Sequence, residues 1–285
     1  MSRIAYVNGR YVRFADAAVS IEDRAFQFGD GVYEVCEVRG GLLIDQTRHL
    51  ARLASSLEAV RIAPPLNERA LRGILREVVA RNRVCDGIAY IQVSRGVARR
   101  DHGFPALSVR PGLVVSARSL DLSAGEINAE RGVRVITLPD ERWARPDIKT
   151  VQLLPNVLAK QAAREAGAAE AWFVDHANCI TEGASTNAWI VGEHGVLLTR
   201  PADKAILRGV TRTTLLDVVA QQGVTFEERA FSLEEAYRAR EAFYSSATTI
   251  AMPVVAIDGR PIGEGTPGPV TLALRRQFHH AAEHG

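Results

Sequence analysis

The amino-acid sequence predicts an α+β protein of two domains, a smaller one over residues 1–120 and a larger one over residues 132–285. In the first half, strand-like and helix-like segments are grouped, which favours an α+β domain over alternating βαβ units. The stretch 121–131 loses apolar periodicity between two strand patterns, so it is the expected interdomain linker. A chain of 285 residues is long enough for this division.

The first elements are expected to be two β-hairpins. Asn8-Gly9 separates two β-rich runs in IAYVNGRYV, and this dipeptide tolerates the positive φ angles of a tight turn. The β-rich runs 33–38 and 42–44 are separated in a similar way by a turn with two glycines. Because side chains alternate along a strand, one face of the second hairpin should carry Tyr33, Val35 and Glu37.

Helical periodicity begins after the second hairpin. Asp45 is the expected N-cap of a helix that carries a leucine stripe and stops before Pro64-Pro65. Asn67 is expected to begin a second helix. Strands that start near Ile88 and Gly112 complete the first domain.

The second half contains further strands and helices. The predicted strands are 132–138, 187–191 and 196–199, together with a hairpin over 171–183. The predicted helices are 156–165, ended by Gly167, 211–222, closed by Gly223, and a further helix that begins with a capping box of Ser232 and Glu235.

Composition narrows the class of protein. The chain has 35 basic and 33 acidic side chains without a basic block, so nucleic acid is not an expected partner. Its first residues lack the apolar core of a secretory signal, and no apolar run reaches the roughly 20 residues of a membrane helix. We therefore expect a cytoplasmic protein without a membrane partner. The three cysteines have no metal-ligand spacing, so no metal site is expected; they are Cys36, Cys85 and Cys179.

Lys149 lies between Ile148 and Thr150, just before an apolar run. Burial disfavours an ammonium ion, and the neutral amine is the form that attacks a carbonyl group to make a Schiff base. Taken alone, a lysine at a strand end more often extends to solvent. Lys160 is a weaker candidate because it lies in an alanine-rich amphipathic helix among polar neighbours.

Two further segments could bind a charged ligand. Glu182 is followed by Gly183 and three small residues, so its carboxylate could meet a buried partner such as a pyridine nitrogen; a surface glutamate in a hairpin is the alternative. Gly209 precedes a helix whose first N–H groups, with the hydroxyl of Thr211, could bind an anion. An ordinary helix N-terminus is the alternative there.

Several motifs in order along nearly the whole chain resemble the fold-type IV pyridoxal-phosphate (PLP) enzymes. They are FGDGVYE from Phe28, HLARL from His49, DIK, NVLAKQ, TEGAST, ILRGVTR and YSSATT from Tyr244. The segment SRGVARRDHGFP is most similar to the D-amino-acid aminotransferases within that family. The resemblance implies two α+β domains with PLP in the cleft between them.

The resemblance also implies cofactor-binding roles for particular residues. Lys149 would form the Schiff base with PLP and act as the proton shuttle, and Glu182 would pair with the pyridine nitrogen. Leu207 would pack under the ring. The phosphate would be bound by Arg52 and by the backbone N–H groups of Val210 and Thr211.

The phosphate site departs from the family at one position. The family's phosphate loop usually offers a threonine hydroxyl where this chain has Ala247. The N–H of Ala247 would still be available, with the hydroxyl of Thr248 or Ser246 as an additional ligand.

Arg100 and His102 resemble the pair that binds the substrate α-carboxylate in D-amino-acid aminotransferases, together with Tyr33. Two cationic groups and a phenol suit a carboxylate. Arg99 beside Arg100 leaves a register shifted by one residue as an alternative. The resemblance further implies a homodimer in which this loop reaches the neighbouring subunit's active site.

The expected reaction is transamination between D-amino acids such as D-alanine and 2-oxo acids such as 2-oxoglutarate. Three other functions fit the same cofactor residues. They are a branched-chain L-amino-acid aminotransferase, an aminodeoxychorismate lyase and a non-catalytic paralogue that binds PLP.

Overall fold

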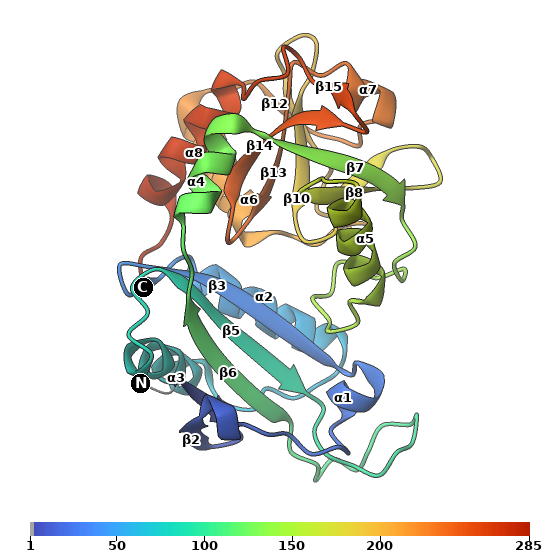
Figure 1. Ribbon diagram of the computed structural model, residues 1–285. Helices are drawn as coiled ribbons and strands as arrows, with labels where there is room; N and C mark the ends of the chain where they lie inside the picture. The colour runs from blue at the N-terminus through green and yellow to red at the C-terminus, as the bar shows by residue number, and fades with distance from the viewer. Residues whose placement is uncertain (1–2) are drawn as a thin grey trace. The chain divides into compact units, whose positions relative to one another are not determined.

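The computed structural model describes residues 3–285 (Figure 1), and the chain divides into two compact units. Unit 1 comprises the chain up to Leu122 with the short segments Ile148–Gln152 and Glu283–Gly285. Unit 2 comprises Ser123–Asp147 and Leu153–Ala282. Each unit therefore contains residues that are distant in sequence.

The predicted linker over 121–131 differs from the structure. The division falls between Leu122 and Ser123, and helix α4 (Ser123–Arg131) belongs to unit 2. Ala129 is the buried residue of this helix. A helix that buries so little shows no apolar stripe in its sequence, which explains why periodicity did not reveal it.

Unit 1 is built on a six-stranded sheet in the order β2-β1-β6-β5-β3-β4, with every neighbouring pair antiparallel. Asn8 and Gly9 have positive φ angles in the first hairpin turn, and Gly40 and Gly41 have them in the second, which confirms both predicted hairpins. The strands are β1 (Ile4–Val7), β2 (Arg10–Arg13), β3 (Gly31–Arg39), β4 (Leu42–Leu43), β5 (Gly87–Ser94) and β6 (Gly112–Ser119).

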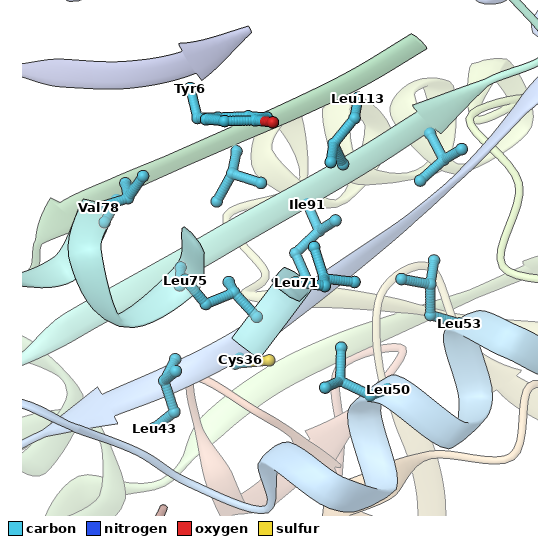
Figure 2. Close-up of a cluster of buried hydrophobic side chains, with 14 of the residues drawn as sticks. Tyr6, Cys36, Leu43, Leu50, Leu53, Leu71, Leu75, Val78, Ile91 and Leu113 are labelled. Carbon is cyan, nitrogen blue, oxygen red and sulfur yellow. The ribbon is translucent and has the colours of Figure 1, made fainter. Parts of the chain in front are cut away.

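Two long helices cover one face of this sheet. They are α2 (Gln46–Ala59) and α3 (Glu68–Arg81), and the shorter η1 (Phe14–Asp16) and α1 (Arg24–Phe28) lie in the connections. Figure 2 shows leucines of α2 and α3 meeting the inward side chains of the strands, such as Cys36 and Ile91. Tyr33 and Val35 alternate with these buried residues and are half-buried on the opposite face.

The two short segments complete the edges of unit 1. The N–H of Tyr33 donates to the carbonyl of Lys149 at 3.0 Å, and Gly285 exchanges two backbone hydrogen bonds with Leu43. Asp45 occupies the N-cap position of α2, as predicted, but its side chain makes no capping hydrogen bond. The carboxylate of Glu283 instead accepts from the N–H and the hydroxyl of Thr47 in the first turn.

Unit 2 contains a nine-stranded mixed sheet in the order β12-β11-β10-β13-β14-β7-β8-β9, with β15 paired to β14. The pairs β14–β7, β7–β8 and β11–β12 are parallel. The strands are β7 (Val133–Pro139), β8 (Glu170–Val174), β9 (Ile180–Gly183), β10 (Asn187–Val191), β11 (Leu197–Thr199), β12 (Phe226–Glu228), β13 (Glu241–Ser246), β14 (Ile250–Ile257) and β15 (Arg260–Pro261).

Helices α5 (Leu154–Glu165), α6 (Val210–Gln222) and α8 (Pro269–Ala281) pack against this sheet and bury apolar side chains on it. α5 connects the parallel strands β7 and β8, and α8 packs on β14 and on α6, as Figure 1 shows. Gly223 ends α6 with a φ of 64°. The predicted capping box of Ser232 and Glu235 is present at α7 (Leu233–Tyr237).

Candidate active site

Lys149 lies in the segment of unit 1 that pairs with the start of β3. Its neighbours Ile148 and Thr150 are buried, whereas Lys149 itself is half-buried. Its Nζ lies 4.3 Å from the centroid of the Tyr33 ring. Lys160 is different, because it is exposed and donates to the carbonyl of Ala169. The structure thus brings together the candidate nucleophile and one of the three candidate substrate-binding residues.

The Tyr33 ring is part of a small aromatic surface on β3 and β5. It stacks on Tyr90 with 5.7 Å between ring centroids, and the Tyr90 hydroxyl donates to Oε1 of Gln92 at 2.7 Å. Burial, with a smaller effect from Tyr33, raises the pKa of Tyr90 to about 12. The phenol of Tyr90 therefore stays protonated at neutral pH and acts as a hydrogen-bond donor.

Arg52 is held by Glu34, which also contacts His49, and the sequence predicted no role for either residue. Its Nε and Nη2 donate to the two carboxylate oxygens of Glu34 at 2.6 and 2.8 Å, and Nδ1 of His49 lies 2.8 Å from Glu34 Oε2. A two-point contact of this kind fixes the plane of the guanidinium group. Glu34 lies on the same buried strand face as Val32 and Cys36, an alternation that could have identified it as a buried carboxylate.

The electrostatics of this group follow from its burial. Burial alone would raise the pKa of Glu34, but the charge of Arg52 and the hydrogen bonds from Arg52 and His49 outweigh it and lower that pKa strongly. Burial lowers the pKa of His49 and outweighs the opposing effect of Glu34. Glu34 is therefore an anion at neutral pH, and it stabilises the Arg52 cation beside it.

Arg100 and His102 lie on the exposed loop between β5 and β6, and both contact Phe28. The Cζ of Arg100 lies 4.9 Å from the centroid of the Phe28 ring, and the His102 ring lies 5.4 Å from it. Between them, the carbonyl of Asp101 accepts a 2.6 Å hydrogen bond from Nη1 of the buried Arg24. The loop is thus attached to the body of unit 1 at the residue between the two candidates.

A partly buried carboxylate organises the anchor of this loop. Asp30 accepts from Nε of Arg24 at 2.8 Å and from Nε and Nη2 of Arg95 at 2.7 and 2.9 Å. Although burial opposes it, the hydrogen bonds and charges of these two arginines lower the pKa of Asp30. No role was predicted from the sequence for Arg24, Asp30 or Arg95, because only the fold brings them together.

In unit 2, Glu182 is buried at the end of β9 and accepts hydrogen bonds from three residues. Nδ2 of Asn187 donates to Oε2 at 2.9 Å, the N–H of Leu207 lies 3.1 and 3.2 Å from the two oxygens, and Nη1 of Arg142 donates to Oε1. Burial raises the pKa of Glu182 despite the opposing effects of Arg142 and the Leu207 N–H. The structure therefore brings Glu182 and Leu207 together, in a setting where a nearby cation would stabilise the carboxylate.

Val210 and Thr211 form the first turn of α6, and both are buried. The N-cap residue Gly209 has no side chain to satisfy the N–H groups of this turn. A Cβ atom at Gly209 would lie 2.0 Å from Oδ1 of Asn187, so the close approach requires glycine. Ala247 follows β13, where Ser246 Oγ lies 3.3 and 2.8 Å from the hydroxyls of Thr248 and Thr249.

Curated relatives match nearly the whole chain. The D-alanine aminotransferase of Bacillus licheniformis is 41% identical over 276 residues, which cover 96% of this chain and 95% of the relative. The D-alanine aminotransferase of Staphylococcus aureus (strain MSSA476) is 36% identical over 279 residues, with 98% and 97% covered.

Solved structures share the fold. The branched-chain amino acid aminotransferase of Escherichia coli superposes with a TM-score of 0.91 at 25% identity and covers 98% of this chain and 94% of its own. The T.th. branched-chain amino acid aminotransferase with pyridoxamine 5'-phosphate gives a TM-score of 0.89 at 26% identity, with the same coverage. These likenesses confirm the predicted α+β architecture of fold type IV. The model of the amino-transferase class IV family matches residues 31–257, and this chain belongs to that family.

Proposed function

We propose that the protein is a PLP-dependent aminotransferase that exchanges amino and oxo groups between D-amino acids, such as D-alanine, and 2-oxo acids, such as 2-oxoglutarate. The observation that carries this choice is the 36–41% identity to D-alanine aminotransferases over almost the full chain. The branched-chain enzymes share the fold at lower identity, 25–26%. Transamination of D-amino acids is therefore favoured over that of branched-chain L-amino acids.

The residues of the two units fit PLP chemically. Lys149 supplies an amine for the cofactor's aldehyde, and Glu182 supplies a buried carboxylate for its pyridine nitrogen. The turn after Gly209 offers N–H groups to a phosphate without a side-chain cap, and Arg52 offers a guanidinium group whose orientation Glu34 fixes. Leu207 and the loop at Ala247 complete the proposed set.

PLP, when bound, withdraws electrons from the substrate's α-carbon and so makes its proton acidic. Lys149 would hold the cofactor through Nζ, and the same amine would serve as the base at the substrate's α-carbon. Nζ would move the proton from that carbon to the cofactor's C4′ atom. Glu182 would keep the pyridine nitrogen protonated through a charge-assisted hydrogen bond.

The substrate's α-carboxylate is bound by Arg100, His102 and Tyr33. Arg100 and His102 are on one exposed loop, which is consistent with a role outside the packed core of their own unit. In the proposed homodimer this loop serves the partner's active site.

Exposed apolar side chains support an oligomer. Leu154, Val157 and Leu158 follow the i, i+3, i+4 spacing of one helix face on α5 and are 69%, 58% and 62% exposed. Clustered exposed apolar side chains often mark an interaction surface. We propose a homodimer in the cytoplasm, and light scattering after gel filtration measures its mass. Across residues 3–285, no helix combines the length and the apolar character that membrane crossing requires.

A spectral half-reaction tests the proposed function. The protein is purified with PLP, and D-alanine or L-leucine is added separately while the absorption of the lysine-bound cofactor is followed. Conversion to pyridoxamine phosphate by D-alanine alone is expected. The Lys149→Ala variant should lack the absorption band of the lysine-bound cofactor. Conversion by L-leucine alone would instead identify a branched-chain enzyme. Pyruvate release from aminodeoxychorismate without an amino acceptor would identify a lyase. Absence of the absorption band in the native protein would rule out Lys149 as the lysine that binds the cofactor.

A further inference from the structure

Arg142 joins two largely buried carboxylates in unit 2. Its Nε and Nη2 donate to the two oxygens of Asp140 at 2.9 and 2.7 Å, and its Nη1 donates to Oε1 of Glu182. The side chains of Arg142, Asp140 and Glu182 are 6%, 14% and 5% exposed. A single cation therefore serves two anions in a largely dry environment.

The neighbours of Arg142 restrict its orientation. Its Cζ lies 4.7 Å from the centroid of the Phe173 ring, and the Thr181 hydroxyl donates to Oδ2 of Asp140 at 2.8 Å. With Asp140 occupying two of the guanidinium's five N–H donors, Nη1 is directed at Glu182. Asp140 thus fixes the orientation in which Nη1 of Arg142 faces Glu182.

We propose that Arg142 is a positioning residue for the proposed transamination, one that holds Glu182 as an anion oriented toward the cofactor's pyridine nitrogen. Asp140 orients Arg142 and partly neutralises its charge. This inference rests on the proposed function, because it concerns the same Glu182.

The physical reason is a competition for one proton. Burial favours the neutral form of Glu182, and a neutral carboxyl group does not stabilise a protonated pyridine nitrogen. The positive charge of Arg142 favours the anion. Asp140 acts in the opposite direction, because its negative charge lies near Glu182 and raises the pKa of that group. Removal of Arg142 and removal of the Asp140 charge should therefore have opposite electrostatic signs.

The test compares Arg142→Met, Arg142→Lys and Asp140→Asn with Glu182→Gln. Arg200→Met is the matched control, because Arg200 is a partly buried arginine of unit 2 that pairs with Asp175. The Kd for PLP is measured on each protein after the cofactor has been removed. The pH at which the absorption band of the lysine-bound cofactor titrates and kcat with D-alanine are measured on each PLP-loaded protein.

A protonated pyridine nitrogen lowers the pKa of the lysine–cofactor linkage, because both groups carry positive charge. In Arg142→Met the band should titrate at higher pH, as in Glu182→Gln, with PLP affinity and kcat about 10- to 100-fold lower. In Asp140→Asn the band should titrate at lower pH. Arg142→Lys should recover part of the kcat lost in Arg142→Met, and Arg200→Met should match the wild type.

The outcomes separate the two hypotheses. If the wild type does not convert D-alanine, the proposed function fails. If the wild type is active and Glu182→Gln impairs it, but Arg142→Met shifts neither titration nor PLP affinity, only the role of Arg142 is overturned. A shift of the same sign in Asp140→Asn and Arg142→Met overturns it as well. Should Arg142→Met be insoluble, Asp140→Asn decides: titration of the band at lower pH than in the wild type supports the role of Arg142, and titration at the same or a higher pH overturns it.

Discussion

Glu34, Asp30 and Glu182 are carboxylates largely withdrawn from solvent, and each is contacted by arginine. A buried ion is costly without a partner, so removing one member of such a group destabilises more than loss of a surface ion pair. The same arrangement fixes the directions of side chains that are expected to contact the cofactor or substrate. At the scale of single residues, stability and activity therefore depend on the same contacts.

Glu34→Gln should destabilise the protein by about 3 kcal/mol, because it leaves Arg52 without its anion. The lowered pKa of Glu34 in the folded state means that its contribution is complete above the unfolded value of about 4.3 and declines as pH falls below it. Urea unfolding at several pH values should show the difference from wild type narrowing below about pH 4. Glu68→Gln, at an exposed position, is the control. If it lowers the free energy of unfolding as much as Glu34→Gln does, the prediction is contradicted.

Arg100→Ala should lower kcat/KM for D-alanine about 10- to 100-fold, because the substrate carboxylate loses a charged partner. An amine without a carboxylate should be affected much less. Steady-state kinetics with both substrates makes the comparison. Equal losses on the two would remove Arg100 from the carboxylate site, and a loss seen only in Arg99→Ala would move the site by one residue.

At the scale of elements, helix starts and loop anchors position the candidate groups. The turn after Gly209 brings the N-terminus of α6 to Asn187, whose amide contacts both Glu182 and the carbonyl of Leu207. The loop that carries Arg100 is fixed by Arg24. Gly209 thus affects the position of Glu182 through Asn187, and Arg24 affects the position of the loop that carries Arg100.

Gly209→Ala should weaken PLP binding, because the new methyl group would displace Asn187 and disturb its hydrogen bond to Glu182. We expect a rise of about tenfold or more in the Kd for PLP, measured by equilibrium dialysis. Gly125→Ala is the matched control in the same unit, since nothing lies within 4 Å of its added Cβ. An unchanged Kd in Gly209→Ala would show that the close approach is not required for binding.

Arg24→Met should release the loop at Asp101 while Asp30 keeps its two hydrogen bonds from Arg95. The KM for D-alanine should rise about tenfold with a smaller change in kcat. The released loop adopts more conformations, and only a fraction of them can bind the substrate. The exposed Arg13→Met should leave KM unchanged. A fall in kcat alone would argue against an anchoring role.

At the scale of the molecule, each unit has its own hydrophobic core, but the chain does not divide at a single point. Residues 148–152 and 283–285 belong to unit 1, although the residues next to them in the sequence belong to unit 2. The nucleophile candidate Lys149 is one of these residues. Unit 1 therefore depends on segments that follow it in the chain.

A fragment of residues 1–122 should accordingly be less stable than unit 1 in the full chain. It lacks the hydrogen bonds between Lys149 and Tyr33 and between Gly285 and Leu43, which close the edges of the sheet. Urea unfolding followed by circular dichroism should show a lower midpoint and a broader transition than the full chain. A cooperative transition at the same midpoint would mean that the two segments contribute nothing.

Local sequence patterns determined the hairpins at Asn8-Gly9 and Gly40-Gly41, the start of α3 and the capping box of Ser232, because turn and cap chemistry acts over a few residues. The ordered motifs likewise identified the family and the candidates Lys149 and Glu182. Helix α4 was missed, since it buries too little to leave a periodic pattern.

Only the tertiary structure decided which charges meet. Glu34 and Arg52 are 18 residues apart, Arg24 and Asp101 are 77 apart, and Arg142 and Glu182 are 40 apart. Such pairs leave no local signal, because their energy comes from shared burial rather than from sequence spacing. The sequence by itself named the candidate reacting groups, and the fold selected the partners that hold them in place.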